Sequence, residues 1–592
     1  MEKWLFWAAL YAPLAGSAGV WGISLYGRAI PGNTWRNGRD GILWGCEGLT
    51  LLSLCLLSLR GSAYTLPNAC GWALSFSADG LRGAWAAATA ALWLAVSLYC
   101  RGYLAHSGHK MRFYAFWLIA EFAAVGSCLA ADLFTTSVFL PLLALAAAVL
   151  AAHWETAAAR RAAASLLRYT VAGGVAVLMG TALLYRLLGG LRYTELLSRS
   201  VLCGDKPALY AALALSIAGL FALCGIFPLH HWLPRAVAQA PAPVAALLCA
   251  AIARAGMPAL LASGAVFASI YQPAALVLLA CGLLGMLRGM LRALREPELR
   301  TLLGWLASSA GAAALAAVMS AVLSGHPGGY AAAFSLLSLG YAFAAQLLCS
   351  GWAEQLLHSH ELRVLQGSGR KNPQLRAVFA AAALCLSGAP LFSGYAAGDY
   401  LSLALLQGAR TARTAGGSGA LFYGTLSVFW VWGVLAAALM LRLWLCLFCA
   451  PNADAALQEK YDASKAALPV LSRTALLLTG ALAACAGLVL CLAPEAVYML
   501  TSGLYGIAAP AAFPFWSLGA LLHSLLSLGL GAGLCLLVYR RTLWPRAAAD
   551  ANDAAACAQA ALFGGTGAKP AGADKEVPSD AASDTSKTSA AH

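Results

Sequence analysis

Long apolar runs recur almost from end to end of this 592-residue chain, and they constrain its fold more than any other feature. A helix needs about 20 mostly apolar residues to cross the hydrocarbon core of a bilayer. Lipid offers the backbone no hydrogen-bond partners, so a spanning run must be helical to satisfy its own peptide groups. The runs therefore predict an all-α polytopic membrane protein.

We expect 14 or 15 transmembrane helices, in line with a composition that is 61% hydrophobic and only 10% charged. Only Lys3 precedes the apolar part of the first run, and no small-residue cleavage site and soluble domain follow it, so we expect a retained span and not a signal peptide. The fifteen predicted spans are 4–26, 41–59, 83–102, 113–130, 134–152, 167–187, 208–227, 243–264, 273–292, 300–323, 330–350, 376–394, 421–449, 474–493 and 514–538.

The net charge of +14 is dispersed over short loops and does not form the basic patch that nucleic-acid binding requires. Lys and Arg favour one set of loops over the other, 24 to nine. Cytoplasmic loops are the ones enriched in Lys and Arg, so we expect a protein of the cytoplasmic (inner) membrane with its N-terminus outside and its C-terminus inside. The nine residues on the loops with fewer Lys and Arg are Lys3, Arg60, Arg82, Arg186, Arg192, Arg199, Lys206, Arg410 and Arg413.

Seventeen cysteines are scattered through the apolar runs without the spacing of zinc or iron–sulfur ligands. The one close pair, Cys446 and Cys449, lies inside an apolar span, which favours packing over redox chemistry. We therefore expect no metal and no cofactor.

Two segments differ from the apolar runs. Residues 450–473 mix acidic and basic side chains with apolar ones, a pattern typical either of a surface helix or of a solvated loop. After about residue 546, Ala, Ser, Asp, Gly and Lys replace the apolar residues, which predicts a disordered cytoplasmic tail.

A cluster of prolines interrupts the pattern after the seventh run. Residues 227–235 read Phe-Pro-Leu-His-His-Trp-Leu-Pro-Arg, residues 240–244 read Ala-Pro-Ala-Pro-Val, and the next helix carries Arg254. Proline breaks helices, and an intramembrane charge is costly and usually functional. The segment therefore predicts an ion pathway at a broken helix, with Pro228 at the break.

A second interruption, at Pro390, lies 162 residues after Pro228. Paired Gly/Pro interruptions in corresponding spans are the sequence sign of a transporter repeat with broken helices around a midplane site. Two five-helix units, 113–272 and 273–449, would have opposite orientations, because an odd number of spans inverts the second unit. The alternative is an accidental match, since Pro and Gly are common in membrane helices.

The same residues resemble a known family. Residues 228–236 and 240–244 look like the signature of the antiporter-like membrane subunits shared by respiratory complex I, multisubunit cation/proton antiporters and membrane-bound hydrogenases. The Leu-Pro-Arg-Ala sequence and the step from Ala240 to Arg254 look most like the large antiporter-like subunit of group 4 hydrogenase and formate hydrogenlyase complexes. Other stretches that agree in order and spacing are Phe76–Leu81, Ala131–Phe134, Glu298–Trp305, Ser387–Pro390 and Gly394–Tyr395.

The resemblance implies an inverted-repeat, proton-translocating module in which a lysine–glutamate pair and further buried lysines relay protons near the midplane. This chain departs from the family at nearly every relay position. Only helix eight keeps a cation, Arg254, and arginine holds its proton at physiological pH. Relay residues are missing at Val138–Pro141 on helix five, Ala222–Gly225 on helix seven, Leu339–Phe343 on helix eleven and Gly398 on helix twelve.

Four residues are candidates for an ion pathway: Arg254, His230, Glu121 and Asp399. Arg254 can polarise a path or attract an anion, and His230 can titrate near neutral pH at the helix break. Glu121, deep in the fourth span, fits a structural role as well as a functional one, while Glu47 in the second span is interpreted as a solvated or paired end residue. Two aspartates lie where turns are expected and can also be helix caps, namely Asp132 and Asp399.

Two classes of function remain. The first is a membrane-arm subunit of a complex I-related or hydrogenase-type oxidoreductase, in which the degenerate relay either moves protons or serves as a scaffold. Its partners would be other membrane and peripheral subunits of that assembly, within the lipid bilayer. The second is a stand-alone secondary transporter or ion antiporter on the same fold, with Arg254 attracting an anion.

The chain has no nucleotide-binding loop or redox-ligand set, so we expect no redox catalysis by the isolated chain. The expected organisation is N-terminal helices in 1–112, two repeats in 113–272 and 273–449, a loop and extra helices in 450–545, and the tail in 546–592.

Overall fold

The computed structural model describes residues 2–26, 34–67, 73–357, 359–452, 454–463, 469–497, 501 and 515–543. Within these ranges, 14 helices are long and apolar enough to cross a membrane. The chain is thus a multi-pass, helical membrane protein, as its apolar runs predict. The predicted tail, 546–592, lies outside the described residues.

The first half of the chain contains one short hairpin and a series of long helices. In order, these are α1 (Glu2–Tyr26), α2 (Thr34–Arg60), β1 (Ala63–Pro67), β2 (Ala73–Ser77), α3 (Gly80–Tyr103), α4 (Lys110–Leu129), α5 (Leu133–Ala151), α6 (Ala157–Leu188), α7 (Tyr193–Leu202), α8 (Lys206–Cys224), α9 (Trp232–Gln239), α10 (Ala242–Leu247), the π-helix η2 (Leu248–Ile252), α11 (Ala253–Ala255) and α12 (Met257–Ile270).

The second half of the chain is helical throughout its described part. Its elements are α13 (Gln272–Arg295), α14 (Leu299–Ser324), α15 (Gly328–Ser338), α16 (Gly340–Leu357), α17 (Leu362–Leu365), α18 (Pro373–Ser387), α19 (Ser393–Thr414), α20 (Ala420–Phe448), α21 (Ala455–Ala463), α22 (Val470–Leu492) and α24 (Leu518–Leu543).

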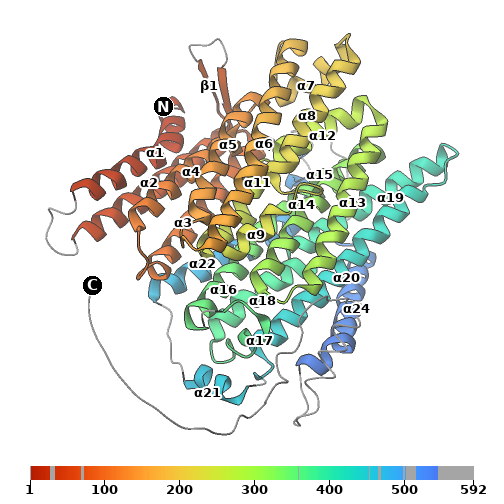
Figure 1. The fold of residues 1–592 in the computed structure, drawn as a ribbon. Coiled ribbons are helices and arrows are strands. Elements are labelled where there is room, and N and C mark those ends of the chain that lie inside the picture. Colours follow the sequence, from red (N-terminus) through yellow and green to blue (C-terminus); the bar gives the residue numbers. More distant parts are fainter. Residues whose placement is uncertain are drawn as a thin grey trace, which may run out of the picture. The chain divides into compact units, whose positions relative to one another are not determined.

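The long helices lie side by side (Figure 1). Helices α1 and α2 form a pair that packs against α3 and α4, and α24 packs along α20 on the opposite side of the array. Between them, α10, α14 and α16 are almost completely buried.

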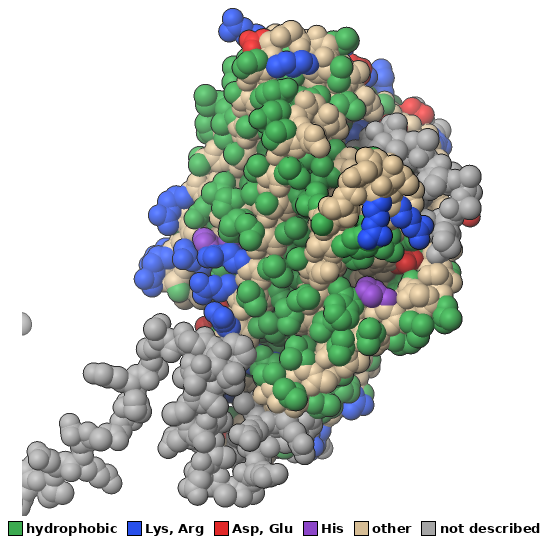
Figure 2. Space-filling view, turned by 90° about the vertical axis from the view of Figure 1, so that its right-hand side faces the viewer, with side chains coloured by type: hydrophobic (Ala, Val, Ile, Leu, Met, Phe, Trp, Pro, Cys, Tyr) green, Lys and Arg blue, Asp and Glu red, His purple; other side chains and the backbone are tan. Residues whose placement is uncertain are grey.

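The outer surface carries the large apolar side chains that a bilayer would contact. Leu518, Leu522, Leu525 and Leu537 on α24 are all exposed. Figure 2 shows one such face, where hydrophobic side chains cover large areas and Lys and Arg side chains lie in a few separate groups. In lipid these leucines are solvated by acyl chains, so their exposure costs nothing.

Side-chain caps define several helix starts. Asp132 precedes α5 and accepts a hydrogen bond from the backbone N–H of Thr135 at 2.6 Å, which confirms its predicted capping role. Thr156 and Asp205 cap α6 and α8 in the same way. Asp399 does not: α19 begins at Ser393, so this aspartate lies inside the helix, and the prediction that it caps a turn is wrong.

The two-stranded antiparallel hairpin of β1 and β2 was not expected from the sequence. It follows α2, and the backbone N–H of Ser75 donates to the side chain of Thr135 at 2.9 Å. Phe76 also pairs with Ala130 through a backbone bridge. The hairpin thus attaches the loop between α2 and α3 to the start of α5.

The polar interval 450–473 contains the short helix α21, so the surface-helix alternative is the correct one for residues 455–463. Asn452 lies in the segment before α21, and its Nδ2 donates to the carbonyl oxygens of Arg363, Val364 and Gln366. The hydroxyl of Tyr461 also donates to Val364. These bonds attach α21 to the α17 region.

Candidate functional site

The predicted break near Pro228 is a tight turn between α8 and α9. Gly225 ends α8 in the left-handed conformation, at φ 63°, where a residue without a Cβ is favoured. The backbone N–H of Gly225 donates to Phe221, and that of Ile226 donates to the same carbonyl at 3.0 Å. Leu229 N–H then donates to the carbonyl of Ile226 at 2.8 Å, which turns the chain toward α9.

The break near Pro390, between α18 and α19, repeats this hydrogen-bond pattern. Gly388 has φ 76° and donates to Leu384, Ala389 donates to the same carbonyl at 3.2 Å, and Phe392 donates to Ala389 at 3.2 Å. The predicted twelfth span, 376–394, is therefore interrupted, and the helical chain continues as α19 to Thr414.

The two turns correspond at a spacing of 163 residues, from Gly225 to Gly388, and not at the 162 residues that separate the prolines. Pro228 is the third residue after its glycine, whereas Pro390 is the second. The left-handed glycine, and not the proline, is thus the common element of the two breaks.

Each break is stabilised by a serine from a distant helix. Ser308 on α14 donates to the carbonyl oxygen of Gly225 at 2.8 Å, and Ser524 on α24 donates to that of Gly388 at 2.7 Å. Helix ends leave carbonyl groups unpaired, and a buried unpaired carbonyl is costly, so both serines satisfy acceptors that the interruption creates.

Arg254 lies in a third interruption, where a π-helical turn separates α10 from α12. Its Nε donates to the carbonyl of Cys249 at 2.7 Å, and its Nη1 donates to the carbonyls of Leu336 and Leu337 at 3.1 and 2.8 Å. The last two carbonyls belong to the final turn of α15, which ends at Ser338. The guanidinium thus caps a helix C-terminus, where unpaired carbonyls and the helix dipole favour a cation.

The side chain of Arg254 is 3% exposed and, among the described residues, has no acidic partner. Its Cζ lies 5.5 Å from the ring centroid of Phe343 on α16. The cation therefore joins α11 to both α15 and α16, and its Nη2 has no hydrogen-bond partner in the described part of the chain.

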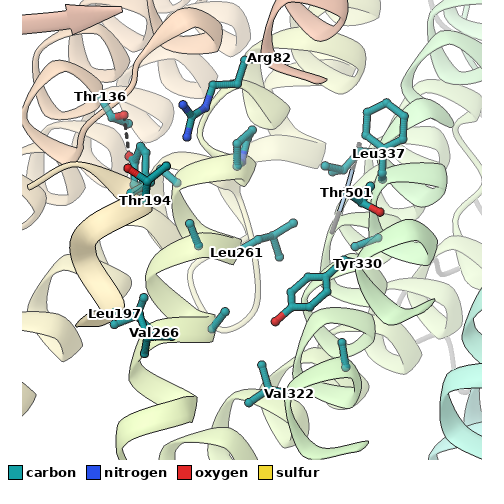
Figure 3. Close-up of a pocket in the computed structure, with 18 of the residues that line it drawn as sticks. Arg82, Thr136, Thr194, Leu197, Leu261, Val266, Val322, Tyr330, Leu337 and Thr501 are labelled. Carbon is teal, nitrogen blue, oxygen red and sulfur yellow. Dashed lines mark hydrogen bonds between the residues drawn. The ribbon is translucent and has the colours of Figure 1, made fainter. Parts of the chain in front are cut away.

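Leu336 and Leu337, whose carbonyl groups bind Arg254, each line a cavity. The Arg82 cavity has a volume of about 560 Å³, and Leu337 is one of its lining residues. Figure 3 shows this cavity, with Arg82, Leu261 and Tyr330 among the side chains around it. The Asp399 cavity, of about 430 Å³, is lined by Leu336. Both volumes are in the range of about 300–1,000 Å³ seen for ligand-binding pockets.

Asp399 is 6% exposed and lines the second cavity together with His523 of α24. Its Oδ2 has no hydrogen-bond partner among the described residues. A buried carboxylate without a cation is costly, so this group is either protonated or in need of a partner that the cavity could supply.

His230 is 1% exposed in the first break. Its Nδ1 lies 3.3 Å from the carbonyl oxygen of Pro228, and its ring centroid lies 4.4 Å from that of His231 and 5.4 Å from that of Trp305. The imidazole is thus packed between aromatic rings of the break and α14.

Glu121 and Glu47 are both fully buried, at 0% exposure. Glu47 accepts hydrogen bonds from the hydroxyl of Ser97 and, at 3.0 Å, from Nε1 of Trp117. The interpretation of Glu47 as a solvated end residue is wrong, because Glu47 is fully buried in the middle of α2. Its carboxyl group is instead paired with donors from α3 and α4.

Sequence reasoning missed a buried ionic network at Arg300. Its Nη1 donates to the carbonyl oxygen of Ala240 at 2.9 Å, and its Nη2 pairs with Glu354 of α16. The hydroxyl of Tyr103 also donates to Glu354, at 2.7 Å. Arg300 thus binds the carbonyl oxygen at the end of α9, next to the Ala-Pro segment.

The four predicted pathway residues do not form one cluster. Within the described ranges, no hydrogen bond or ion pair joins any two of Arg254, His230, Glu121 and Asp399. The same ranges contain no group of three or more His, Cys, Asp or Glu side chains able to hold a metal ion. The four candidate residues therefore occupy separate polar sites within the apolar interior of the protein.

Comparisons with known proteins agree with this architecture. A family model described as "NADH:quinone oxidoreductase/Mrp antiporter, TM" matches residues 130–422, which include the breaks at Gly225 and Gly388 and the Arg254 position. The chain is 29% identical to NADH-quinone oxidoreductase subunit N of Desulforudis audaxviator over 346 residues, 57% of this chain and 67% of that protein. It covers only 42% of a matching Staphylococcus haemolyticus protein of the mnhA2 type.

Two solved structures share the fold. A chain of the Mrp complex from Dietzia sp. DQ12-45-1b has a TM-score of 0.71 and 20% identity over 93% of this chain and 60% of its own length. A chain of the membrane-bound sulfane sulfur reductase, an archaeal respiratory membrane complex, has a TM-score of 0.66 and 17% identity over 88% of this chain and 98% of its own.

The interrupted helices and these matches define a polytopic protein of the antiporter-like class. The match to the family model covers residues 130–422, just under half of the chain, and the chain is similar to members of that family.

Proposed function

We propose that this chain is a proton-translocating-type membrane-arm subunit of a complex I-related or hydrogenase/formate hydrogenlyase-type oxidoreductase, with a degenerate relay. Its partners are other membrane and peripheral subunits of that assembly. The match of residues 130–422 to the family model supports the class, since one relative is named as a subunit of an NADH-quinone oxidoreductase.

The single observation that carries the proposal is the position of Arg254 on the last turn of α15. A cation held between interrupted helices biases the movement of any charge through the cavities beside it. Because arginine keeps its proton, Arg254 acts by its field, and the proton itself must be carried by groups such as Asp399, His230 and Glu121 or by water.

The proposed organisation follows the two similar breaks. Units 113–272 and 273–449 are inverted repeats, preceded by N-terminal helices in 1–112 and followed by the extra helices in 450–545. The repeated hydrogen-bond pattern at Gly225 and Gly388 supports this assignment. The distribution of Lys and Arg supports an inner-membrane protein with its N-terminus outside and its C-terminus in the cytoplasm.

The alternative is a stand-alone secondary transporter, which the unpaired cation Arg254 would serve by attracting an anion. Affinity purification of the native protein separates the two functions, because a component of such an assembly carries hydrogenase- or quinone-reductase-type partners with it. The purified complex is then reconstituted in vesicles that contain a pH-sensitive dye. Redox-driven acidification or alkalinisation supports the proposal, whereas substrate-driven transport by the chain alone supports the alternative.

A further inference from the structure

The Asp399 cavity, of about 430 Å³, is lined by residues of α15, α19, α20 and α24 and borders the break at Gly388. Helix α19 contributes Tyr395 and Asp399, which are four residues apart and therefore share one face of the helix. Helix α20 contributes Trp430, and α24 contributes His523. The cavity thus brings together polar and aromatic side chains from helices that are distant in the sequence.

Three polar groups of residues that line this cavity have no hydrogen-bond partner in the described part of the chain. They are Oδ2 of Asp399, the hydroxyl group of Tyr395 and Nε1 of Trp430. Asp399 is 6% exposed and Tyr395 is 3% exposed, so both are largely cut off from bulk solvent. A buried polar group without a partner is costly, and three of them at one cavity indicate that a bound molecule supplies the partners.

Serine side chains at the cavity do not serve the carboxyl group of Asp399. Four of the serines that line it already donate to backbone carbonyl groups, namely Ser387, Ser402, Ser524 and Ser527. A hydroxyl group has one proton to donate, so these four have none left for a carboxylate. The donor for Asp399 must therefore come from elsewhere.

The charge of Asp399 is also uncompensated. Its cavity has no Lys or Arg among the described lining residues, and none of the ion pairs within the described ranges includes Asp399. A buried carboxylate needs a cation. A hard metal ion takes about six or more oxygen ligands, whereas Phe429, Trp430 and other apolar residues form much of this lining. Aromatic rings attract organic ammonium ions, so the lining favours an organic cation.

The two indole rings of the cavity differ in their hydrogen bonding. Nε1 of Trp432 donates to the hydroxyl group of Ser309 at 2.8 Å, whereas Nε1 of Trp430 has no acceptor among the described residues. The ring of Trp430 lies near that of His523, with centroids 6.1 Å apart and planes at 30°. An indole N–H can only donate, so a molecule that satisfies Trp430 must carry an acceptor atom.

We propose that the Asp399 cavity binds a small organic amine that also carries a hydrogen-bond acceptor, such as a hydroxyl group. The ammonium group donates to Asp399, the acceptor atom receives the N–H of Trp430, and the hydroxyl group of Tyr395 pairs with the same polar end. The apolar body lies against the aromatic side chains. Leu406 lines the cavity and is 37% exposed, so the cavity borders the outer surface of the helices. This binding site goes beyond the proposed function and does not depend on it.

Isothermal titration calorimetry of the full-length protein in an uncharged detergent tests the site with three probes of similar size. Phenylethanolamine carries both the ammonium and the hydroxyl group, phenethylamine lacks the hydroxyl group, and styrene glycol has a neutral hydroxyl group in place of the ammonium. We expect one saturable site for phenylethanolamine. Loss of the ammonium group should weaken binding at least about tenfold, and loss of the hydroxyl group about two- to tenfold.

Three substitutions assign the contacts. Asp399→Asn keeps the size of the side chain and should weaken phenylethanolamine binding at least about tenfold, while Tyr395→Phe should weaken it about two- to tenfold. Trp430→Phe should weaken phenylethanolamine binding about two- to tenfold and leave phenethylamine binding unchanged, because only phenylethanolamine has an acceptor for the indole N–H.

Two matched controls should bind all three probes like the wild type. Trp444→Phe also removes an unpartnered indole N–H from α20, but Trp444 is not among the described residues of the cavity lining. Asp205→Asn removes a carboxylate that caps α8, and asparagine caps helices equally well.

Equal wild-type affinity for phenylethanolamine and styrene glycol overturns the proposal, and so does uptake that never saturates, which is partition into the detergent alone. This comparison needs no variant, so it holds even where a substitution impairs folding. Wild-type affinity in Asp399→Asn, or equal losses in Trp430→Phe and Trp444→Phe, also overturns it. Binding is measured without proton translocation, so the site and the proposed function can fail separately.

Discussion

Arg254 donates from Nη1 to the carbonyl oxygen of Leu337 at 2.8 Å, and this bond joins two interrupted helices that are 83 residues apart in the chain. The acceptors of the guanidinium are all backbone carbonyls, since Cys249 and Leu336 bind it in the same way. The cation is thus stabilised by helix ends and not by an acidic side chain, which leaves its charge available to act on the cavities nearby.

Replacing Arg254 with methionine removes the charge and three hydrogen bonds, whereas lysine keeps the charge. We expect Arg254→Met to abolish coupled proton translocation while the complex still assembles, and Arg254→Lys to retain a measurable part of it. Dye-loaded vesicles measure translocation, and co-purification measures assembly. Unchanged pumping by the methionine variant would exclude Arg254 from the mechanism, and an equal loss in both variants would assign its role to hydrogen bonding.

The serine donors should stabilise the two breaks independently. Ser308→Ala and Ser524→Ala each leave a glycine carbonyl unpaired, at a cost of about 1–3 kcal/mol in unfolding free energy. Hydrogen exchange should rise at Ile226 and Leu229 in the first variant only, and at Ala389 and Phe392 in the second only.

The control for the serine variants is Ser427→Ala, because this exposed serine donates only within its own helix, to Tyr423. It should change neither break. If Ser308→Ala increased exchange at both breaks equally, the two turns would not be independent.

Replacing only one partner of the ion pair between Arg300 and Glu354 should lower the free energy of unfolding substantially. Arg300→Met or Glu354→Gln leaves a buried polar group without its partner, which typically costs about 3–5 kcal/mol. The double variant should lose less than the sum of the two single losses. Thermal unfolding in detergent provides the comparison, with the exposed pair Glu195 and Arg199 as a control worth about 0.3–0.5 kcal/mol.

His153, in the loop after α5, should make stability depend on pH. Burial, aided by the nearby Arg112, lowers the pKa of His153 to about 4 from its ordinary 6.5. The unfolded chain then binds more protons than the folded one between these values, so stability falls as the pH drops from 6.5 toward 4. His153→Phe keeps the ring contact with Phe113 and should flatten this dependence, and parallel melting curves for both proteins would contradict the assignment.

The helical architecture was predictable because a bilayer imposes one solution on any long apolar run. The two breaks were also predictable, because glycine and proline mark them in the sequence. Helix α19 was missed beyond residue 394, because Asp399, Gln407, Arg410 and Arg413 lower its hydropathy. The hairpin was missed because its strands are only five residues long and gain their partners from α5.

The candidate site was only partly predictable, for a reason of geometry. Arg254, His230 and Asp399 stand out as polar residues in apolar runs, but their acceptors and cavities depend on helices distant in the chain. Nothing near Gly225 or Gly388 indicates Ser308 or Ser524. The burial of Glu47 depends on which face of α2 meets α3 and α4, and apolar residues surround it on every face.

The serine bonds also impose a sequence of events on biosynthesis. The carbonyl of Gly225 finds its donor 83 residues later, whereas that of Gly388 waits for a donor 136 residues later, on α24. Chains emerge from the ribosome N-terminus first. The nascent protein can therefore complete its first bend long before its second, whose serine donor lies on α24, the last described helix.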